Sequence, residues 1–430
     1  MTDADASLVS PPYRERLYRR NFPFFLADSI LFTLAMAIIS ATTVIPDFLC
    51  RLTDSEILIG LSGSLFTIGF TLPQLFIARY IVRAARKKWW FVGPNILVRP
   101  VMLVCAILIV WIGADDAALI LLVFFTCYGI AAFGDDLVGV PWADLAGTSL
   151  DNRWRARVFG LTSAATGVIM LGLAPLIGAV LGTSGPGFPA NYAVLFGAAG
   201  VLFIVSIVPG LFFHELPGGR AREQLPALGE FLPELLQVLR MDGAFRAFII
   251  ARMFTSLFMM AAPFYIGYAT VQLGLSSDVA VPVLLAMQTT GSIVGALAYT
   301  WLGARSNLLY IRLALGGSAL LPLCALLAGM VGPLPLYLGF LVSGLATTDL
   351  AFGFLNWVVG YADADHRPLY VGLSNTVAAV ISLIAPFIAG TIVESVGYRP
   401  LFVTALVMAL SALFVALRFL RDPEPRAPAQ

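Results

Sequence analysis

The sequence has few charges and few of the side chains that bind metals. Only 12% of its 430 residues are charged, against about 25% in soluble domains, and the net charge is +1. It has two histidines and four cysteines, and no cysteine pair shows the Cys-x-x-Cys spacing of zinc and redox sites. We therefore predict no metal site and no cofactor. The near-neutral charge balance also argues against a nucleic-acid partner, which would need a strongly basic face.

The motifs of nucleotide-driven and enzymatic chemistry are missing as well. No Walker-type phosphate loop occurs, so ATP does not drive this protein directly. The adjacent Asp135 and Asp136 could belong to a metal–diphosphate site in a membrane-embedded enzyme, but such a site needs a second acidic cluster facing it. Asp349, which lies in a similar apolar run further along the chain, stands alone. We predict that the protein is not an enzyme.

Long hydrophobic runs are abundant. Hydrophobic residues make up 59% of the chain, above the roughly 45–50% of soluble domains. A membrane-spanning helix needs about 20 mostly apolar residues, and twelve runs reach that length. They are residues 22–46, 57–80, 90–113, 117–141, 158–182, 192–213, 246–271, 280–302, 308–331, 335–360, 370–393 and 401–419. The pattern predicts an all-α integral membrane protein with twelve transmembrane helices.

The connections between these runs are short, with one exception that divides the chain in two. Residues 214–245 combine a Pro/Gly/Arg-rich entry with an amphipathic stretch suited to the membrane surface. We therefore expect five regions: a tail at 1–21, a six-helix bundle at 22–213, the linker 214–245, a second six-helix bundle at 246–419 and a tail at 420–430. Nothing in the polar tail at 1–21 indicates a cleaved signal peptide.

Basic residues predict which side of the membrane each loop occupies. With the N-terminus in the cytoplasm, only Arg51 and Arg399 of the 26 Lys and Arg residues face outside. Arg99, Arg252 and Arg312 lie within spans, near their inner ends. The opposite orientation would leave most of the basic residues outside. We expect a multi-pass protein whose two termini and linker are cytoplasmic.

The two halves share residues at matching positions. Arg99 and Asp136 are followed 213 positions later by Arg312 and Asp349, so each half has an Arg in its third span and an Asp in its fourth. The Ala-Pro-Leu-Ile-Gly run of the fifth span is echoed by Ala-Pro-Phe-Ile-Ala-Gly in the eleventh. Parallel repeats of this kind are related by an axis along the membrane normal. We therefore predict two pseudo-symmetric six-helix bundles.

This layout resembles the major facilitator superfamily of secondary transporters over residues 20–420. The family's loop after the second span carries two glycines, an acid and several basic residues, and Arg83, Arg86 and Lys87 match its basic positions. Both glycines are replaced by alanine and the acid by Val82. The resemblance implies the superfamily fold. The missing carboxylate implies that another pair serves the inner gate or that the gate is weaker.

Three stretches narrow the resemblance to poorly characterised bacterial members of the superfamily. They are RNFPFFLADS at the start of the first span, TTVIPDFL after it and LPQLFIARY at the end of the second. The resemblance thus implies a bacterial inner (plasma) membrane. It leaves the substrate open.

Charged residues within the spans are candidates for proton movement or gating, because a charge at mid-helix costs about 2.5–3.5 kcal/mol on insertion scales. In one interpretation, Arg99 pairs with Asp136, and Arg312 with Asp349, to hold neighbouring helices in register. In another, such pairs form and break during transport. The full set is Asp28, Arg99, Asp135, Asp136, Arg252, Arg312 and Asp349.

Two members of this set allow further interpretations. Asp135 has no counterpart acid in the second half and shares a helix face with Tyr128. It is either a proton or cation-ligand site beside aromatic rings, or a carboxylate solvated at the cytoplasmic interface. Asp28 and Arg252 lie at similar depths, so they could pair across the halves or be satisfied separately.

Neutral polar residues within the spans are candidates for substrate contact. Each also has a simpler interpretation, as a hydrogen bond between helices or, for tyrosine, as part of an interfacial belt. The candidates are Thr42, Thr43, Gln74, Tyr128, Thr166, Tyr265, Gln288 and Asn375.

We expect a secondary transporter that moves a small organic solute by alternating access and is coupled to protons. Efflux of an amphipathic, drug-like compound is favoured, because the expected cavity is rich in Phe, Met and Tyr and poor in charge. Uptake of a sugar or other metabolite is the alternative within this class, and a transporter-like binding or sensor protein without flux is the alternative outside it. The expected partners are the substrate, protons and the lipid bilayer, with the protein a monomer.

Overall fold

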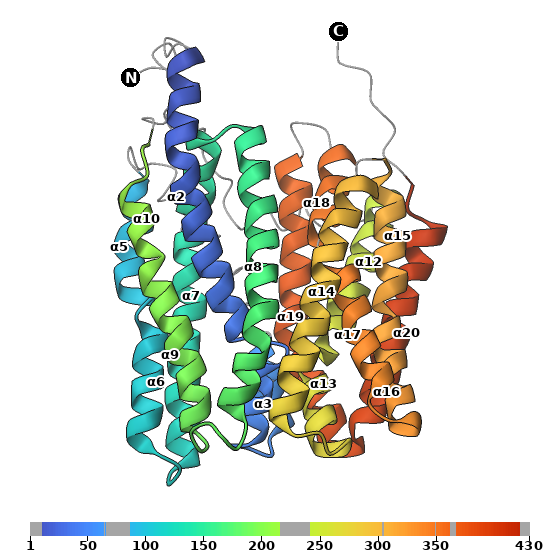
Figure 1. Ribbon diagram of the computed structural model, residues 1–430. Helices are drawn as coiled ribbons and strands as arrows, with labels where there is room; N and C mark the ends of the chain where they lie inside the picture. The colour runs from blue at the N-terminus through green and yellow to red at the C-terminus, as the bar shows by residue number, and fades with distance from the viewer. Residues whose placement is uncertain are drawn as a thin grey trace. The chain divides into compact units, whose positions relative to one another are not determined.

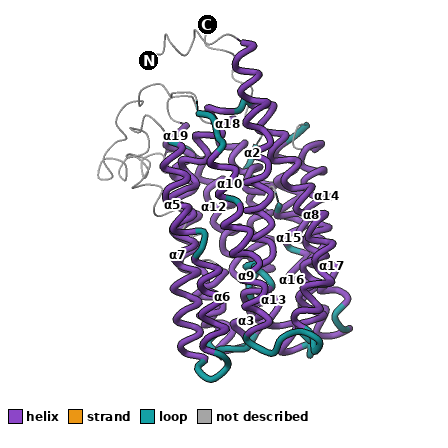
Figure 2. The backbone as a smooth tube through the Cα atoms, turned by 60° about the vertical axis from the view of Figure 1, so that its left-hand side comes forward, coloured by secondary structure: helices purple, strands orange, loops and turns teal. Residues whose placement is uncertain are grey.

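The computed structural model describes residues 11–63, 65, 87–215, 241–302, 305–348, 350–361 and 367–421, and these residues form helices joined by short loops (Figures 1 and 2). The contacts divide the chain into two units. The first is Met1–Leu52 with Leu65–Leu225, and the second is Thr53–Ser64 with Pro226–Gln430. The bounds of the two predicted bundles, residues 22–213 and 246–419, are not tested by this division and remain a prediction.

Ten helices in the described ranges are long and apolar enough to cross a membrane. They are Glu15–Ile38, Lys88–Ile112, Ala117–Ser149, Arg153–Leu181, Ala190–Leu211, Gly243–Gln272, Ser277–Tyr299, Asn307–Val331, Tyr370–Val396 and Tyr398–Arg418. The two other predicted spans, 57–80 and 335–360, include residues outside the described ranges. The all-α membrane architecture is therefore confirmed.

The first unit is built on its long helices. Its elements are α2 (Pro11–Ile38), α3 (Val44–Cys50), α5 (Lys88–Val98), α6 (Val101–Ile112), α7 (Ala117–Ser149), α8 (Asn152–Leu181), α9 (Ala190–Val205) and α10 (Ile207–Leu211). Helix α2 packs against α8 and α9, and α7 packs against α5 and α6. Stacked rings fill part of the core, with Phe213 centred 3.9 Å from Phe25 and 5.6 Å from Phe91.

The first span ends earlier than the predicted 22–46. Helix α2 stops at Ile38, and α3 starts at Val44 after a turn in which the Ser40 carbonyl accepts from the amide of Ile45 at 3.1 Å. Pro46 explains the break, because in a continuous helix its ring would clash with the carbonyl four residues earlier. In the first turn of α3, its missing N–H removes no helical hydrogen bond.

The second unit contains a core of aromatic rings between its helices. Its elements are α12 (Gly243–Phe258), η1 (Met259–Ala261), α13 (Phe264–Gly267), η2 (Tyr268–Gln272), α14 (Ser277–Leu302), α15 (Asn307–Ser318), α16 (Leu320–Val331), α17 (Leu334–Thr347), α18 (Leu350–Tyr361), α19 (Arg367–Val396) and α20 (Tyr398–Arg418). Phe248 stacks on Trp357 with ring centroids 4.6 Å apart. Helices α14 and α17 approach so closely that a Cβ at Gly291 or Gly344 would overlap the facing backbone.

Residues 53–64 pack with the second unit although they lie early in the chain. A Cβ at Gly390 of α19 would come within 2.6 Å of the Cα of Ile57, so only glycine permits this approach. The Glu394 carboxylate accepts from the Ser55 hydroxyl at 3.3 Å and from the Ile57 amide at 3.4 Å. The Tyr398 hydroxyl donates to Glu56 at 2.9 Å. This segment therefore belongs to the second unit's packing.

Glu56 gives this packing a pH dependence. Burial raises its pKa above the ordinary 4.5, the charges of Glu394 and Asp54 raise it further, and the hydrogen bond from Tyr398 opposes them. The folded contact therefore prefers the neutral acid: its contribution is complete below pH 4.5 and is lost as the pH rises through the shifted pKa. We expect Glu56→Gln, whose amide oxygen can still accept from Tyr398, to raise the thermal unfolding midpoint at pH 7.

The comparison needs a pH series and a carboxyl control. Scanning fluorimetry between pH 5 and pH 8, at about half-unit steps, should show a smaller decline with pH for Glu56→Gln than for wild type. Asp115→Asn removes an exposed carboxyl in a loop of the first unit and should leave the wild-type profile intact. A Glu56→Gln profile parallel to wild type would contradict the assignment.

Candidate functional site

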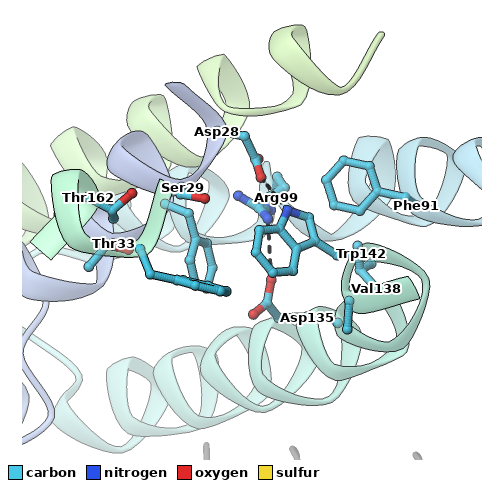
Figure 3. Close-up of a pocket in the computed structure, with 13 residues that line it drawn as sticks. Asp28, Ser29, Thr33, Phe91, Arg99, Asp135, Val138, Trp142 and Thr162 are labelled. Carbon is cyan, nitrogen blue, oxygen red and sulfur yellow. Dashed lines mark hydrogen bonds and ion pairs between the residues drawn. The ribbon is translucent and has the colours of Figure 1, made fainter. Parts of the chain in front are cut away.

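The first unit contains a cavity of about 360 Å³ with mostly apolar walls and three ionisable side chains (Figure 3). It lies between α2, α5, α7 and α8. The lining residues are Asp28, Ser29, Phe32, Thr33, Phe91, Arg99, Asp135, Val138, Gly139, Trp142, Ala143, Phe159 and Thr162. Such a concave, apolar site with a few convergent polar groups is typical of a small-molecule site.

An ion pair crosses this cavity from the α5–α6 junction to α7. Arg99 Nη2 lies 3.5 Å from Asp135 Oδ1, and the two side chains are 6% and 24% exposed. Arg99 also donates from Nε to Asn95 at 2.9 Å and from Nη1 to the Ser206 hydroxyl. The Phe32 ring centroid lies 4.6 Å from its guanidinium carbon. Arg99 is therefore held by a carboxylate, two neutral acceptors and an aromatic face.

The local sequence positions this arginine. Asn95 lies one turn before Arg99 on α5, a spacing at which two helical side chains meet. Pro100 follows and cannot donate an amide hydrogen, so α5 gives way to α6 at this point. The break places Arg99 beside the middle of α7 at the cavity wall.

Asp28 is the second carboxyl group of the cavity. It is 3% exposed, and its Oδ2 accepts from the indole Nε1 of Trp142 at 2.8 Å. Its Oδ1 is buried and has no hydrogen-bond partner among the described residues. Figure 3 shows Asp28 and Asp135 approaching Arg99 and Trp142 from opposite sides. Two carboxylates facing one guanidinium leave one negative charge that a proton or a cation would neutralise.

Arg99 contacts the acid next to its predicted partner, and the predicted pair with Asp136 remains a prediction. The sequence repeat paired Arg99 with Asp136, but the carboxylate that Arg99 contacts among the described side chains is Asp135. Asp135 is therefore paired rather than simply solvated. The Asp136 side chain lies outside the described part of the structure, as do Asp349, Gln74, Arg83 and Arg86.

The two arginines of the second unit have different surroundings. Arg312 donates to the carbonyls of Ala416 at 3.1 Å and Leu420 at 2.8 Å, at the C-terminal end of α20. Arg252 donates from Nη2 to Asn375 at 3.2 Å. Arg252 and Asp28 each have a partner within their own unit, and the pair predicted across the halves remains a prediction.

The predicted tyrosines are packed in cores. Tyr128 is fully buried and stacks on Phe124 at 5.4 Å. Tyr265 is 3% exposed and stacks on Phe402 at 4.8 Å. Neither residue lines the first-unit cavity.

The other described candidates for substrate contact are also not among the residues that line that cavity. Thr42 and Thr43 lie in the turn between α2 and α3, where the Ser40 and Thr42 hydroxyls are 3.2 Å apart. Thr166 is buried in α8, one turn beyond the lining residue Thr162. Gln288 is half-buried on α14, and Asn375 holds Arg252. Lys87 of the loop motif contacts Asp144, and its amide donates to Glu215 at 2.8 Å.

Sequence reasoning missed several lining residues, of which Trp142 is the most informative. It lies seven residues after Asp135, so both project from one face of α7. Ser29 and Thr33, four residues apart on α2, flank the cavity in the same way. The helical spacing of these residues from Asp28 and Asp135 is the sequence signal that could have identified them.

Comparison with known proteins gives a family match over part of the chain and several solved structures of similar fold. Residues 283–430 match the family model described as Major Facilitator Superfamily. A mutant of the nucleoside transporter NupG has a similar structure, with a TM-score of 0.71 at 12% identity over 93% of this chain and 98% of that one. The chain as a whole therefore has the fold of these solved transporters, and its C-terminal part, residues 283–430, is similar to the major facilitator superfamily.

Two further structures share the fold. An auto-inhibited POT family peptide transporter has a TM-score of 0.66 at 13% identity, over 96% of this chain and 99% of that one. A D-xylose-proton symporter has a TM-score of 0.66 at 13% identity, over 94% and 98%. No curated protein sequence matches this transporter.

The ion pair predicts a non-additive effect of mutation on this transporter. Asp135→Asn leaves the buried Arg99 guanidinium without its carboxylate, so we expect it to destabilise the protein by about 1–3 kcal/mol. Replacing both partners, as Arg99→Met with Asp135→Leu, should cost less than the sum of the single changes. Thermal unfolding of the purified protein measures the coupling. Strict additivity of the two changes would show that the pair contributes nothing.

Proposed function

We propose that this transporter couples the movement of a small amphipathic organic solute to protons, with Asp28 as the group that carries the proton. The observation behind this proposal is the Asp28 carboxyl, which is 3% exposed with Oδ1 unpartnered among the described residues. Efflux is the preferred direction. We also propose a monomer in a bacterial inner membrane with both termini in the cytoplasm, because the basic residues are concentrated on that side.

The surroundings of Asp28 support a proton rather than a permanent charge. Arg99 is paired with the Asp135 carboxylate and donates hydrogen bonds to Asn95 and Ser206, so its positive charge is balanced without Asp28. An ionised carboxylate in an apolar cavity is costly unless it is paired. A proton removes that cost, and a change in the access of water to the cavity would change the occupancy of the proton. This is the behaviour that coupling requires.

The walls of the cavity support an amphipathic solute. Phe32, Phe91, Trp142 and Phe159 present aromatic surface, and the hydroxyls of Thr33 and Thr162 add hydrogen-bonding groups. Large apolar walls with few polar groups suit a solute that is mostly apolar. Uptake of a sugar or other metabolite is the alternative. Support for it comes from the names of two proteins of similar structure, a D-xylose-proton symporter and a nucleoside transporter.

Flux in proteoliposomes tests the coupling. Vesicles with an imposed pH gradient and an internal pH dye should show solute movement linked to proton movement across a panel of amphipathic solutes and sugars. We expect Asp28→Asn to lose gradient-driven accumulation by at least about tenfold, the loss produced by about 1.4 kcal/mol, while solute exchange without a gradient continues. Asp116→Asn, at the exposed N-terminus of α7 and outside the cavity, keeps a capping side chain and is the matched control.

Three outcomes would contradict the proposal. Undiminished gradient-driven accumulation in Asp28→Asn would remove Asp28 from coupling. Equal loss in Asp116→Asn would show that the effect is not specific to the cavity. Ligand binding without flux under any gradient would favour a sensor over a transporter.

A further inference from the structure

The three arginines within the spans are satisfied in three different ways. Arg99 has the Asp135 carboxylate, and Arg312 has the two carbonyls of Ala416 and Leu420. Arg252 has neither: its partners within the described ranges are the amide of Asn375 and an aromatic ring. A cation inside a membrane span is expensive unless it is paired, and among the described residues Arg252 has neither a carboxylate nor the C-terminal end of a helix beside it.

The geometry around Arg252 leaves part of its guanidinium available. Its Nε is buried and has no hydrogen-bond partner among the described residues. Nη2 donates to Asn375 Oδ1 at 3.2 Å, and the Asn375 side chain is exposed. The Phe354 ring centroid lies 5.4 Å from the guanidinium carbon. The Nη edge thus lies next to an exposed amide, with an aromatic ring close by.

Arg252 lies within its span and away from both of its ends. It follows Gly243, the start of the span, by nine residues, or about 14 Å of helix, and the whole span Gly243–Gln272 is about 45 Å long. A cation in this position favours an anionic ligand.

We propose that Arg252 and Asn375 bind the carboxylate of an amphipathic organic anion. A guanidinium matches a carboxylate through two parallel N–H donors. At Arg252, Nε has no partner among the described residues, and Nη2 gives only one of its two hydrogens to Asn375. Asn375 adds an amide beside them, and Phe354 offers apolar surface to the body of the solute. The inference concerns the second unit and rests on the proposed function only in holding that the bound anion is the transported solute.

A binding experiment tests this site without measuring flux. The purified full-length transporter is titrated with 1-naphthoate, decanoate and benzoate, and with 1-naphthamide as the uncharged match of the first. Binding is read as a rise in the thermal unfolding midpoint, because a ligand of the folded state stabilises it. We expect a carboxylate, and not the amide, to raise the midpoint. Arg252→Gln should weaken carboxylate binding by about 10- to 100-fold, the loss of one charged hydrogen-bonding group.

Asn375→Asp is the decisive variant because it keeps the charge of Arg252. A loss of binding in this variant cannot be attributed to a protein destabilised by removal of that charge. The new carboxylate lies where the Asn375 amide now accepts from Arg252, so it occupies the guanidinium from within the protein. We expect unliganded stability equal to or above wild type together with loss of carboxylate binding. Arg305→Gln, a loop arginine beside Trp301, removes a cation elsewhere in the same unit and should leave binding intact.

The inference is overturned if none of the three carboxylates binds, if the amide binds as well as the acid, or if Asn375→Asp binds like wild type. Its failure is distinct from failure of the proposed function. Proton-coupled flux of an uncharged solute without carboxylate binding would reject only the Arg252 site. Carboxylate binding lost in Asn375→Asp, without flux under any gradient, would support the site and reject the transport proposal.

Discussion

Neutralising the Arg99 guanidinium inside the bilayer is the constraint on which the first unit's site depends. Its side chain is 6% exposed, and it takes one contact from α7, one from its own helix and one from Ser206 after α9. Elements distant in the chain are thereby joined around one charge. Breaking any one of them leaves a buried donor unpaired, which is more costly than the contact was favourable.

This arrangement determines what Asp28 can do. Because Asp135 and neutral acceptors already surround the guanidinium, Asp28 is held through a neutral indole donor, and one of its oxygens stays unpaired among the described residues. A carboxyl group in that position can exchange a proton without dismantling the ion pair beside it. The ion pair and the carboxyl group proposed to carry the proton therefore share one cavity but are held by different partners.

The sequence was sufficient for the architecture and for the identity of most buried charges. Hydrophobic length located the spans, and repeat spacing singled out Arg99 and Arg312. It did not predict the contact of Asp135 with Arg99, because adjacent residues project about 100° apart on a helix and spacing alone does not give the packing of α7. Nor could it foresee that Arg312 binds the carbonyl of Ala416, since that contact joins residues 104 apart in the chain.

Local chemistry explains the remaining differences. The turn at residues 41–43 interrupts a run that looks continuously apolar, and Pro46 marked the break that hydropathy averaging concealed. The sequence singles out Thr42, Thr43 and Tyr265 as polar residues within or near the spans, and Tyr128 also because it shares a helix face with Asp135. The structure places them in a turn or in aromatic cores, whereas the cavity residues follow from helical spacing around Asp28 and Asp135.

The central claim, that Asp135 is the structural carboxylate and Asp28 the exchangeable one, is tested most directly by infrared difference spectroscopy of carboxyl protonation on acidifying the membrane-reconstituted transporter. The account predicts a protonated-carboxyl band that is absent in Asp28→Asn and retained in Asp135→Asn. A band that survives in Asp28→Asn and disappears in Asp135→Asn would contradict it.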